Sequence, residues 1–594
     1  MPCLPRLLLI AALAPCAGIA QAAEVARVDV VGLDEEMTEN VRQSLSLVDA
    51  AGRDLSDRRL EYLLGEAEEE TRGALEPFGY YSPSIRVDRS TGAGGVNVTI
   101  TVDPGAPVRV RETNVAIEGD GRDDRYLREE LAEFEPDTGE VFEHPVYEAS
   151  KAQISRRLAE RGYFDATFES RRVEVTRAEN AADIDLIWNS GRRYNIGNVE
   201  FNQTPRQIVY ERLLERLVYW EPGSYYHQGK LDRLREGLRR LDYFTAIDIE
   251  PMPEKAVDGE VPVLVTLVPA KRSVYTAGLG YGTDSGGGVT LGVERRYLNM
   301  RGHKALAQLD YLQRRKTLTL RYRIPAFAWF DGWYTFSAQA ADEQTDYVDT
   351  RRIDFVASRS GELNEYLTAI VAVHALRERW AYTVEDVEAD DAPVDYRYAT
   401  FTFPSIRAEY IDVDNRLEPR DGLGGTLMLR GGVEGVGSDA TFAQVQATAR
   451  WFRGLDERSR LILRGEVGRT LIEDPVGSLA PAIRFHAGGD RSIRGYAYRE
   501  VGPRVGPEGR QYAIGARNVV TGSVEYERYF TERWGAAVFV DSGSAFNDSP
   551  DWRTGVGVGL RFRSPVGPVR VDIAHGLDDP DSSFQLYLSL GAEL

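Results

Sequence analysis

The sequence predicts a two-part protein: three α+β modules of strand, helix, helix, strand, strand order, followed by an all-β transmembrane barrel of about 16 antiparallel strands. Two observations indicate this fold class. In the first half of the 594-residue chain, a segment with amphipathic helices recurs three times at intervals of about 80 residues. From about Lys271 onward, helical periodicity gives way to short segments in which apolar and polar residues alternate.

Residues 1–22 are predicted to be a secretory signal peptide. Arg6 precedes an apolar stretch over residues 7–14, and small residues end in an Ala-Gln-Ala step at 20–22. A cation, an apolar core and an A-x-A cleavage site are the three parts of such a signal. We therefore expect the mature chain to begin at Ala23 and to be exported.

The cysteine content limits the chemistry of the exported chain. Both cysteines, Cys3 and Cys16, lie within the predicted signal, so we expect no disulfide, no thiolate metal site and no catalytic thiol. A lipoprotein would instead keep Cys16, but Pro15 stands where a lipoprotein signal has a small residue.

Charge and hydropathy exclude further classes of protein. The chain carries 72 Lys and Arg against 93 Asp and Glu, a formal net charge of −21, without a basic stripe, which argues against nucleic-acid binding. No apolar run of about 20 residues follows the signal, which excludes a helical membrane protein. The mean hydropathy of −0.36 is compatible with a barrel, because barrel strands have only one apolar face.

The 6 His show no ligand spacing, and no nucleotide loop or nucleophile elbow is present, so we expect no metal, no cofactor and no enzyme activity.

Each predicted module contains an aromatic triplet between its last helix and the next strand. Before the third triplet, for example, Leu231, Leu234 and Leu238 recur at steps of three and four, which predicts a helix with one apolar face. Alternating runs follow each triplet and predict strands. The triplets are Gly79-Tyr80-Tyr81, Gly162-Tyr163-Phe164 and Asp242-Tyr243-Phe244.

The order of elements, the length of the unit and the aromatic triplet resemble POTRA domains, the periplasmic modules of outer-membrane assembly factors. The resemblance covers residues 23–270, with one module expected in each of the ranges 23–105, 106–191 and 192–270. It implies a periplasmic location for this arm. An exposed sheet edge in such a module has unpaired N–H and C=O groups that can capture an extended segment by β-augmentation.

Residues 271–594 are predicted to form the barrel. Near its start Leu279 lies between Gly278 and Gly280, and near its end Leu586 and Leu588 alternate with polar residues. One apolar face and one small or polar face suit a strand that separates lipid from a wet lumen. Closure into a barrel is what allows such strands into lipid, where no backbone edge stays unpaired. A large soluble β protein is the alternative.

Motifs in the second half are similar to those of the outer-membrane insertase superfamily that includes BamA and TamA. Ile493-Arg494-Gly495-Tyr496 resembles the [VI]-R-G-[FY] tip of a long loop that folds into the barrel. The end of the chain resembles the G-x-E-L terminus of the TamA branch, to which we expect the protein to be closest. The other residues that carry the resemblance are Asp414, Asn415, Arg416, Pro419 and Gly422, similar to a D-N-R-x-x-P-x-x-G turn; Phe539, Asp541 and Gly543, similar to an F-x-D-x-G strand; Ser564, Pro565, Gly567 and Pro568, similar to an S-P-x-G-P turn; and Gly591 and Leu594 at the terminus.

The arginine of the loop motif calls for a buried acidic partner. A guanidinium that enters a barrel lumen is partly desolvated, which is costly unless carboxylates pair with it. Glu525 and Asp541 lie on two successive predicted strands after the loop, and the fork of an arginine suits two carboxylates. We predict that Arg494 pairs with Asp541, with Glu525 as a second candidate, and holds the loop inside the barrel. A solvated surface arginine is the alternative.

The resemblance implies a factor of the Gram-negative outer membrane that inserts or secretes β-barrel clients such as autotransporters. The partners it implies are client proteins, outer-membrane lipid and a TamB-like protein anchored in the inner membrane. As a mechanism, we expect a weak seam between the first and last strands, where a client strand is templated by β-augmentation. Gly278, Gly280 and Gly282 lower the packing of the first strand, and the last strand is short, with Gly591 and Leu594 at its end.

Two alternatives remain open from the sequence. A two-partner secretion transporter would export one dedicated protein through a similar barrel, although it usually has two such modules and an N-terminal plug helix. A passive porin would need neither the modules nor an inward arginine loop.

Overall fold

The structure is a computed structural model that describes residues 23–92, 95–282, 286–344, 348–382, 396–505, 512–564, 567–578 and 584–590. The predicted signal peptide, Pro565, Gly591 and Leu594 lie outside the described residues. No helix among these residues is long and apolar enough to cross a membrane.

The chain divides into two compact units, and the third module contributes to both. The units are Met1–Asn198 with Trp220–Leu231 and Pro251–Val263, and Val199–Tyr219 with Asp232–Glu250 and Leu264–Leu594.

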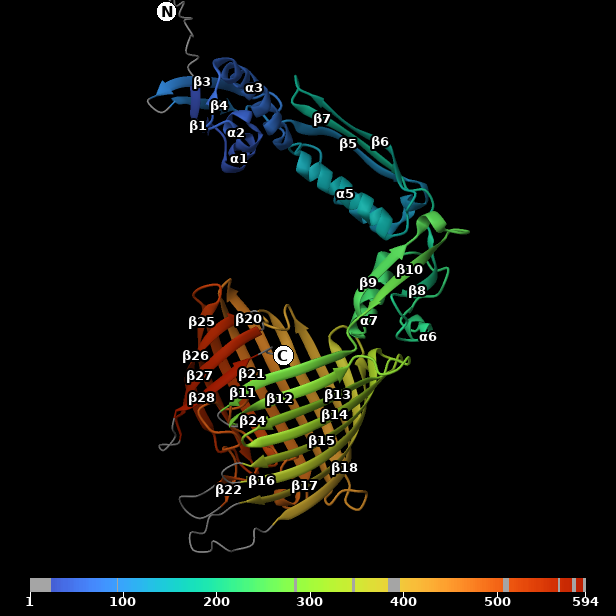
Figure 1. Cartoon of the computed structure of the whole chain (residues 1–594), viewed down its shortest axis with the longest axis vertical. Helices are drawn as coiled ribbons and strands as arrows, with labels where there is room; N and C mark the ends of the chain where they lie inside the picture. The colour runs from blue at the N-terminus through green and yellow to red at the C-terminus, as the bar shows by residue number, and fades with distance from the viewer. Residues whose placement is uncertain are drawn as a thin grey trace, which may run out of the picture. The chain divides into compact units, whose positions relative to one another are not determined.

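The first module is a four-stranded sheet with helices (Figure 1). The strand order is β2-β1-β4-β3, with β1 parallel and β3 antiparallel to β4. Asp34 and Ser56 cap α1 and α3 by accepting hydrogen bonds from backbone N–H groups of their first turns. The elements are β1 (Ala23–Val31), α1 (Glu35–Ser44), α2 (Ser46–Asp49), β2 (Asp54–Leu55), α3 (Asp57–Leu75), η1 (Glu76–Phe78), β3 (Ser84–Gly92) and β4 (Gly95–Asp103).

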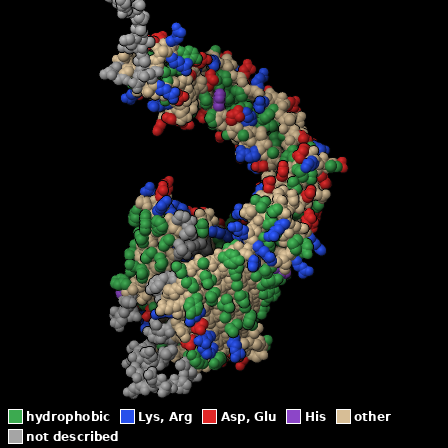
Figure 2. All heavy atoms as spheres, viewed as in Figure 1, with side chains coloured by type: hydrophobic (Ala, Val, Ile, Leu, Met, Phe, Trp, Pro, Cys, Tyr) green, Lys and Arg blue, Asp and Glu red, His purple; other side chains and the backbone are tan. Residues whose placement is uncertain are grey.

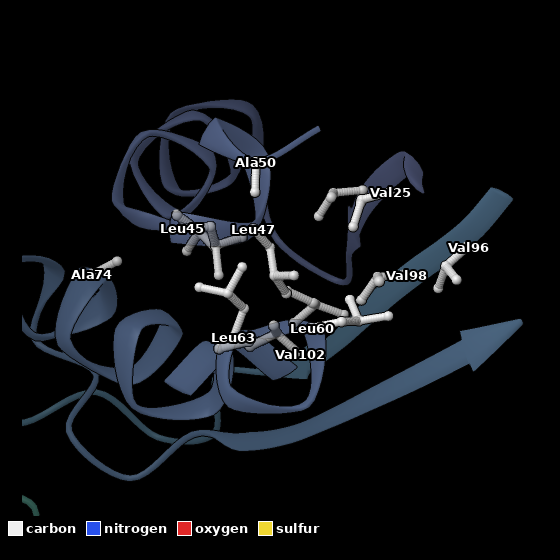
Figure 3. Close-up of a cluster of buried hydrophobic side chains, with 14 of the residues drawn as sticks. Val25, Leu45, Leu47, Ala50, Leu60, Leu63, Ala74, Val96, Val98 and Val102 are labelled. Carbon is white, nitrogen blue, oxygen red and sulfur yellow. The ribbon is translucent and has the colours of Figure 1, made fainter. Parts of the chain in front are cut away.

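The core of the first module forms between its helices and one face of the sheet (Figure 3). On β4, Val98 and Ile100 are fully buried, and Leu60 and Leu63 of α3 are among the helix residues in the same cluster. The alternation of β4 and the helical spacing of α3 therefore place their apolar side chains on one shared side.

The second and third modules each have a three-stranded sheet, with the orders β5-β7-β6 and β8-β10-β9. In the second module β5 is parallel and β6 antiparallel to the central β7. The elements are β5 (Arg109–Glu118), η2 (Gly119–Asp123), α4 (Arg125–Ala132), α5 (His144–Glu160), β6 (Thr167–Thr176), β7 (Ala181–Asn189), β8 (Asn195–Gln203), α6 (Glu211–Glu215), α7 (Gln228–Arg240), β9 (Phe244–Pro251), η3 (Pro253–Lys255) and β10 (Glu260–Pro269).

The first residue of each aromatic triplet has a left-handed backbone. The φ angles are 85° at Gly79, 88° at Gly162 and 54° at Asp242. Glycine has no steric penalty in this region, and aspartate tolerates it better than most residues. The triplets therefore mark the point where each helix ends and the chain turns toward the next strand.

The second half is a 16-stranded antiparallel sheet in which every strand pairs with its neighbours along the chain. Together with the three modules it confirms the predicted fold class. Strands β11 and β28 stand at the two ends of the sheet order, and Cα atoms of the two approach within 8 Å. The strands are β11 (Ser273–Gly282), β12 (Gly286–Arg295), β13 (Lys304–Leu312), β14 (Arg315–Pro325), β15 (Phe330–Gln344), β16 (Val348–Glu362), β17 (Leu367–Tyr382), β18 (Arg397–Val413), β19 (Gly422–Gly432), β20 (Phe442–Asp456), β21 (Ser459–Ile472), β24 (Asn518–Tyr529), β25 (Trp534–Phe546), β26 (Arg553–Ser564), β27 (Gly567–Gly576) and β28 (Gln585–Leu590).

The two faces of the barrel wall differ in chemistry. Hydrophobic side chains cover the outer face that is in view in Figure 2, and Leu279, Phe355 and Val373 are 89%, 57% and 51% exposed. On β24 and β25, Glu525 and Asp541 are buried while Val524 and Val540 are exposed. The acids therefore face the lumen and the valines face outward, as the alternation of a lipid-facing strand requires.

Candidate functional site

The segment between β21 and β24 carries the Ile493–Tyr496 motif into the barrel, and it includes η4 (Val476–Ser478), β22 (Arg504–Val505) and β23 (Tyr512–Ala513). Ile493, Arg494 and Tyr496 are 0%, 4% and 1% exposed. Ile493 and Tyr496 pack in an apolar cluster with Val519 and Ala545 of the barrel wall. An earlier part of the segment packs with Phe401 and other residues of β17, β18 and β20. Apolar contacts therefore place the arginine in the barrel interior.

Arg494 is bound by carboxylates from three strands. Its Nε and Nη2 donate to Asp541 Oδ2 and Oδ1 at 2.7 and 3.0 Å, a bidentate pair. Its Nη1 donates to Glu525 Oε2 at 2.8 Å and to Asp572 Oδ2 at 3.0 Å. The remaining Nη2 donor reaches Ser523 Oγ at 3.3 Å. All five N–H donors of the guanidinium thus have acceptors, which is what burial of this group requires. We call Arg494 with Glu525, Asp541 and Asp572 the arginine lock.

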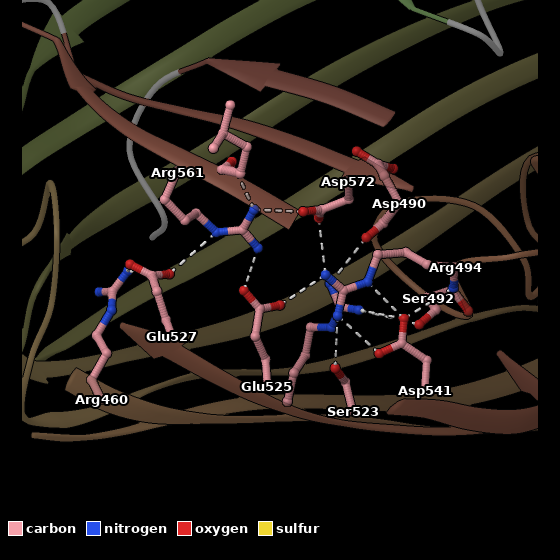
Figure 4. A network of polar contacts seen from close by, with 12 residues as sticks. Arg460, Asp490, Ser492, Arg494, Ser523, Glu525, Glu527, Asp541, Arg561 and Asp572 are labelled. Carbon is pink, nitrogen blue, oxygen red and sulfur yellow. Dashed lines mark hydrogen bonds and ion pairs between the residues drawn. The ribbon is translucent and has the colours of Figure 1, made fainter. Parts of the chain in front are cut away.

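A second buried arginine joins the same acids (Figure 4). Arg561 on β26 pairs with Glu525 and Asp572, and its Nε donates to Glu527 Oε2 at 3.3 Å. Glu527 in turn accepts from Arg460 Nη2 at 3.0 and 3.1 Å. The network therefore extends along the inner face of the barrel wall, from β21 to β27.

Each acid of the network lies against at least one arginine. Arg464 completes the network, because its Nη2 lies 3.6 Å from Asp541 Oδ2 while it also donates to backbone carbonyls of the loop at Asp490 and Ser492. Its members are the arginines Arg460, Arg464, Arg494 and Arg561 and the acids Glu525, Glu527, Asp541 and Asp572. Among the described residues, each of the four acids thus has an arginine partner, which avoids an uncompensated buried carboxylate, the costly case.

Aromatic and glycine residues shape the seat of the loop tip. The guanidinium carbon of Arg494 lies 3.3 Å from the ring centroid of Phe539, a cation–π contact in a desolvated place. Gly495 has a φ of 101°, and a Cβ there would overlap the backbone of His575. A Cβ on Gly555 of β26 would overlap the carbonyl oxygen of Arg494. Only glycine therefore lets the tip lie directly against the wall at these two positions.

The loop tip also contacts the last described strand. The Tyr587 hydroxyl on β28 accepts from Gly495 N–H at 3.1 Å and donates to the Tyr496 carbonyl at 2.8 Å. The Tyr496 hydroxyl donates to the Thr554 carbonyl at 3.3 Å. One phenol on β28 is thus bound to the backbone on both sides of the Gly495–Tyr496 peptide.

The two turn motifs lie near each other at the opposite end of the network. Arg563, just before the S-P-x-G-P turn, donates from Nε to Glu418 at 2.8 Å, and Arg460 donates to the Pro419 carbonyl. Within the first turn, Asp414 accepts from the N–H groups of Asn415 and Arg420. Side chains thus tie together two turns far apart in the sequence.

The remaining predicted residues have local roles. Asn415 accepts from two N–H groups of its own turn, and Ser564 donates to the Gly567 carbonyl at 2.6 Å. Pro568 pairs with Arg563 across β26 and β27, and Gly543 pairs with Thr521 across β24 and β25. The predicted seam residues Gly278, Gly280 and Gly282 all lie on β11.

The structure thus brings Arg494 together with both acids predicted from the sequence, Asp541 and Glu525. Sequence reasoning missed the roles of Asp572, Arg561 and Tyr587. Asp572 stands five residues after Gly567 of the turn motif, on a strand whose alternation puts it inward, and that parity was the available signal. Among the described residues, no group of three or more His, Cys, Asp or Glu is arranged to hold a metal ion.

Three family models match the chain. Residues 298–593 match the Omp85 superfamily domain, residues 27–104 match POTRA domain TamA domain 1, and residues 110–189 match the POTRA family described as a surface antigen variable number repeat. The chain is an Omp85-superfamily outer-membrane protein with periplasmic POTRA domains. This agrees with the predicted class and location.

Relatives and structures of this superfamily resemble the chain at low identity. Outer membrane protein assembly factor BamA of Nitratidesulfovibrio vulgaris is 24% identical over 504 residues, covering 82% of this chain and 61% of that protein. BamA of Neisseria meningitidis serogroup B is 22% identical over 462 residues, covering 72% and 55%. The chain therefore spans less than two thirds of the length of either relative. The crystal structure of Haemophilus ducreyi BamA lacking POTRA domains 1–3 has a TM-score of 0.66 at 17% identity, covering 82% of this chain and 99% of that one, so the two share a fold.

Proposed function

We propose that this Omp85 protein assembles outer-membrane proteins by templating client β-strands at the edge between β11 and β28. The observation that carries the proposal is the unequal attachment of β28. On one side it pairs with β27 over the register Val569–Leu590 to Ala574–Gln585, and from inside Tyr587 binds the loop tip. On the other side β28 is the end of the sheet order, and within the described residues its Cα atoms approach those of β11 within 8 Å without strand pairing.

In this mechanism the arginine lock holds the resting barrel. While Arg494 keeps its carboxylates, the loop tip stays seated and Tyr587 keeps β28 aligned. Movement of β28 away from β11 makes its unpaired edge accessible, and a client strand can satisfy the N–H and C=O groups there by β-augmentation. Free energy for the reaction comes from these new hydrogen bonds and from burial of the client's apolar face in lipid.

The POTRA arm supplies edges of the same kind in the periplasm. In the second module β6 is an edge strand, next to the central β7, and most of its residues are exposed. In the first module β3 is an edge strand. We infer that extended clients, such as autotransporter segments, dock on these edges before they reach the barrel.

We further propose that a TamB-like protein anchored in the inner membrane docks on the first module. The support is the match of residues 27–104 to POTRA domain TamA domain 1. A photo-crosslinking residue at Asp88 on the exposed edge strand β3 should capture this partner, and one at exposed Glu69 on α3 should not. Equal capture from both positions, or none from Asp88, would count against the docking site.

A disulfide across the seam tests the templating mechanism. Residues 23–594 contain no cysteine, so single cysteines placed along β11 and β28 can be paired without background thiols. We expect the oxidised seam pair to abolish insertion of an autotransporter barrel into liposomes and reduction to restore it. A control pair at Val293 and Ala307, which face each other on β12 and β13, should leave insertion unchanged. Insertion that survives the seam disulfide contradicts the mechanism.

The same liposomes distinguish the other functions. Insertion of several unrelated clients supports an assembly factor, whereas export of a single dedicated protein without insertion would assign a two-partner transporter. Ion conductance without either activity would assign a porin.

Tyr587→Phe tests whether the lock and the seam strand are coupled. Loss of the hydroxyl leaves the Gly495 N–H and the Tyr496 carbonyl without this partner, at a cost of about 1–3 kcal/mol. We expect faster spontaneous crosslinking to open-edge probes at β28 with the Arg494 contacts intact. An unchanged β28 edge would separate the lock from the seam.

A further inference from the structure

A cavity of about 200 Å³ lies where the third module meets the barrel. Its walls come from the segment after α6, from α7 and from the turn between β14 and β15, all within one compact unit of the chain. The lining includes Arg216, Arg233 and Arg240 from the module and Phe327, Phe330 and Trp333 from the barrel side. It is thus a cationic and aromatic cavity beside the turn that joins β14 and β15.

Two of its arginines have no acidic partner within the described part of the chain. The Arg216 guanidinium lies 5.6 Å from the ring centroid of Phe327, and that of Arg233 lies 4.2 and 5.3 Å from those of Tyr219 and Phe330. Both arginines are exposed. Aromatic contacts orient their planar groups, and Arg233 also has a side-chain hydrogen bond with Tyr219. A guanidinium has five N–H donors, so donors remain for an anion.

Neighbouring charges are satisfied and fix the walls of the cavity. Arg240 pairs with Glu236 at 2.9 Å and with Glu362 at the end of β16. Asp242 accepts from Arg296 Nε at 2.7 Å. These ion pairs therefore stabilise the walls of the cavity, and Arg216 and Arg233 take no part in them.

The barrel wall beside the cavity faces lipid. Tyr322 on β14 pairs across the sheet with Phe336 on β15, and Ile324 pairs with Tyr334. Tyr322, Phe336 and Tyr334 are 36%, 51% and 49% exposed. Aromatic residues at the end of lipid-facing strands occupy the level of lipid headgroups. An anion held by Arg216 and Arg233 would lie at that level.

We propose that this cavity binds the phosphate of an anionic phospholipid from the periplasmic leaflet. Guanidinium groups match the geometry of phosphate and form charge-assisted hydrogen bonds with it. The exposed aromatic side chains offer the acyl chains a surface beside the headgroup. The bound lipid would join α7 to the β14–β15 turn and so hold the last POTRA domain against the membrane surface.

Native mass spectrometry of the full chain in detergent tests the site. With dioleoylphosphatidylglycerol and dioleoylphosphatidylcholine added in equal amounts, we expect the wild type to retain the anionic lipid in preference. Replacing both arginines, Arg216→Gln with Arg233→Gln, should lower retained phosphatidylglycerol by at least about fivefold, since two charge-assisted contacts are lost. The control Arg239→Gln changes charge on the same helix outside the cavity and should retain the lipid.

Each other outcome overturns the proposal. Equal retention of the two lipids by the wild type, or unchanged retention in the double variant, removes the site. Displacement of the lipid by millimolar inorganic phosphate would assign the cavity to a soluble anion, and displacement by a peptide with a C-terminal carboxylate would assign it to a protein ligand. The heat-dependent gel shift of the barrel verifies that each variant is folded, and Arg216→Lys with Arg233→Lys, which keeps both charges, should recover part of the binding.

Discussion

Within the described ranges, arginines are buried against carboxylates both in the barrel and in the second POTRA domain, and the two clusters connect different parts of the molecule. In the barrel, Arg494 arrives on a loop and meets acids from β24, β25 and β27. In the second POTRA domain, Asp124 caps α4 and binds Arg161, which lies at the end of α5, at 2.7 Å. One cluster attaches a loop to a wall, and the other fastens neighbouring parts of one small domain.

The two clusters also differ in which charge is in excess: several donors surround one carboxylate in the POTRA domain, and several carboxylates surround one arginine in the lock. Asp124 is one carboxylate among several donors: Arg161, the Tyr163 hydroxyl at 3.2 Å and the Tyr126 N–H at 3.1 Å. Arg494 is one cation among three carboxylates. Removing Arg494 therefore leaves mutually repelling acids, whereas removing the charge of Asp124 leaves arginines that can turn toward water. The comparison teaches that the lock is the more costly of the two clusters to break.

Arg494→Ala should have the largest effect. It leaves Glu525, Asp541 and Asp572 partly uncompensated in a buried place, at a cost of about 3–5 kcal/mol. We expect a lower temperature for the heat-dependent gel shift of the barrel and loss of client insertion. Arg528→Ala on the same β24 is the control, because its pair with Asp456 is half exposed. A variant with wild-type barrel stability and insertion would refute the lock.

Asp124→Asn should have the next largest effect, confined to the second POTRA domain. Asparagine can still cap α4, so the change tests the buried charge, at a cost of about 2–3 kcal/mol. Limited proteolysis should cleave this domain faster while the barrel gel shift stays unchanged. Asp123→Asn alters an exposed neighbour and should be silent. Equal effects on domain and barrel would contradict the separation of the two clusters.

Gly495→Ala should cost about 2 kcal/mol, from a left-handed backbone and a clash with the backbone of His575. Since all charges of the lock remain, this variant separates loop seating from ion pairing. Accessibility of a cysteine label in the loop tip measures the unseating. Gly477→Ala in the same segment has room for a Cβ and serves as control. A tip that stays protected in the Gly495 variant would show that seating tolerates a side chain.

Acidification should weaken the second POTRA domain by the smallest amount. Burial would raise the pKa of Asp124, but the hydrogen bond and charge of Arg161, the Tyr126 N–H and Arg193 outweigh it and hold the pKa below its usual range. A lowered folded-state pKa stabilises the domain above the unfolded pKa of about 4, and this contribution is lost as pH falls below that value. The stability difference between wild type and Asp124→Asn should therefore shrink as pH falls below about 4. A difference that persists unchanged at pH 2 would mean that the charge of Asp124 does not stabilise the domain.

Much of the architecture follows from local patterns. Steps of three and four in Leu231, Leu234 and Leu238 predict α7, and the alternation of Val524 with Glu525 predicts a strand with one wet face. The pairing of Arg494 with Asp541 follows from a motif and from strand parity. The roles of Asp572 and Arg561 were not predicted from the sequence. Strand parity indicates which face of the sheet a side chain is on, but it does not indicate which strands lie beside the loop tip.

The sequence by itself determined that three modules repeat, that strands replace helices after about Lys271, and that a buried arginine requires acidic partners. Each of these depends on residues near one another in the chain. The tertiary structure alone decided which arginines pair with Glu525, Glu527, Asp541 and Asp572, and that Tyr587 on β28 touches the loop. These contacts join residues up to 92 positions apart. They depend on strand register and on where the loop enters the lumen, and those are set by packing of the whole barrel.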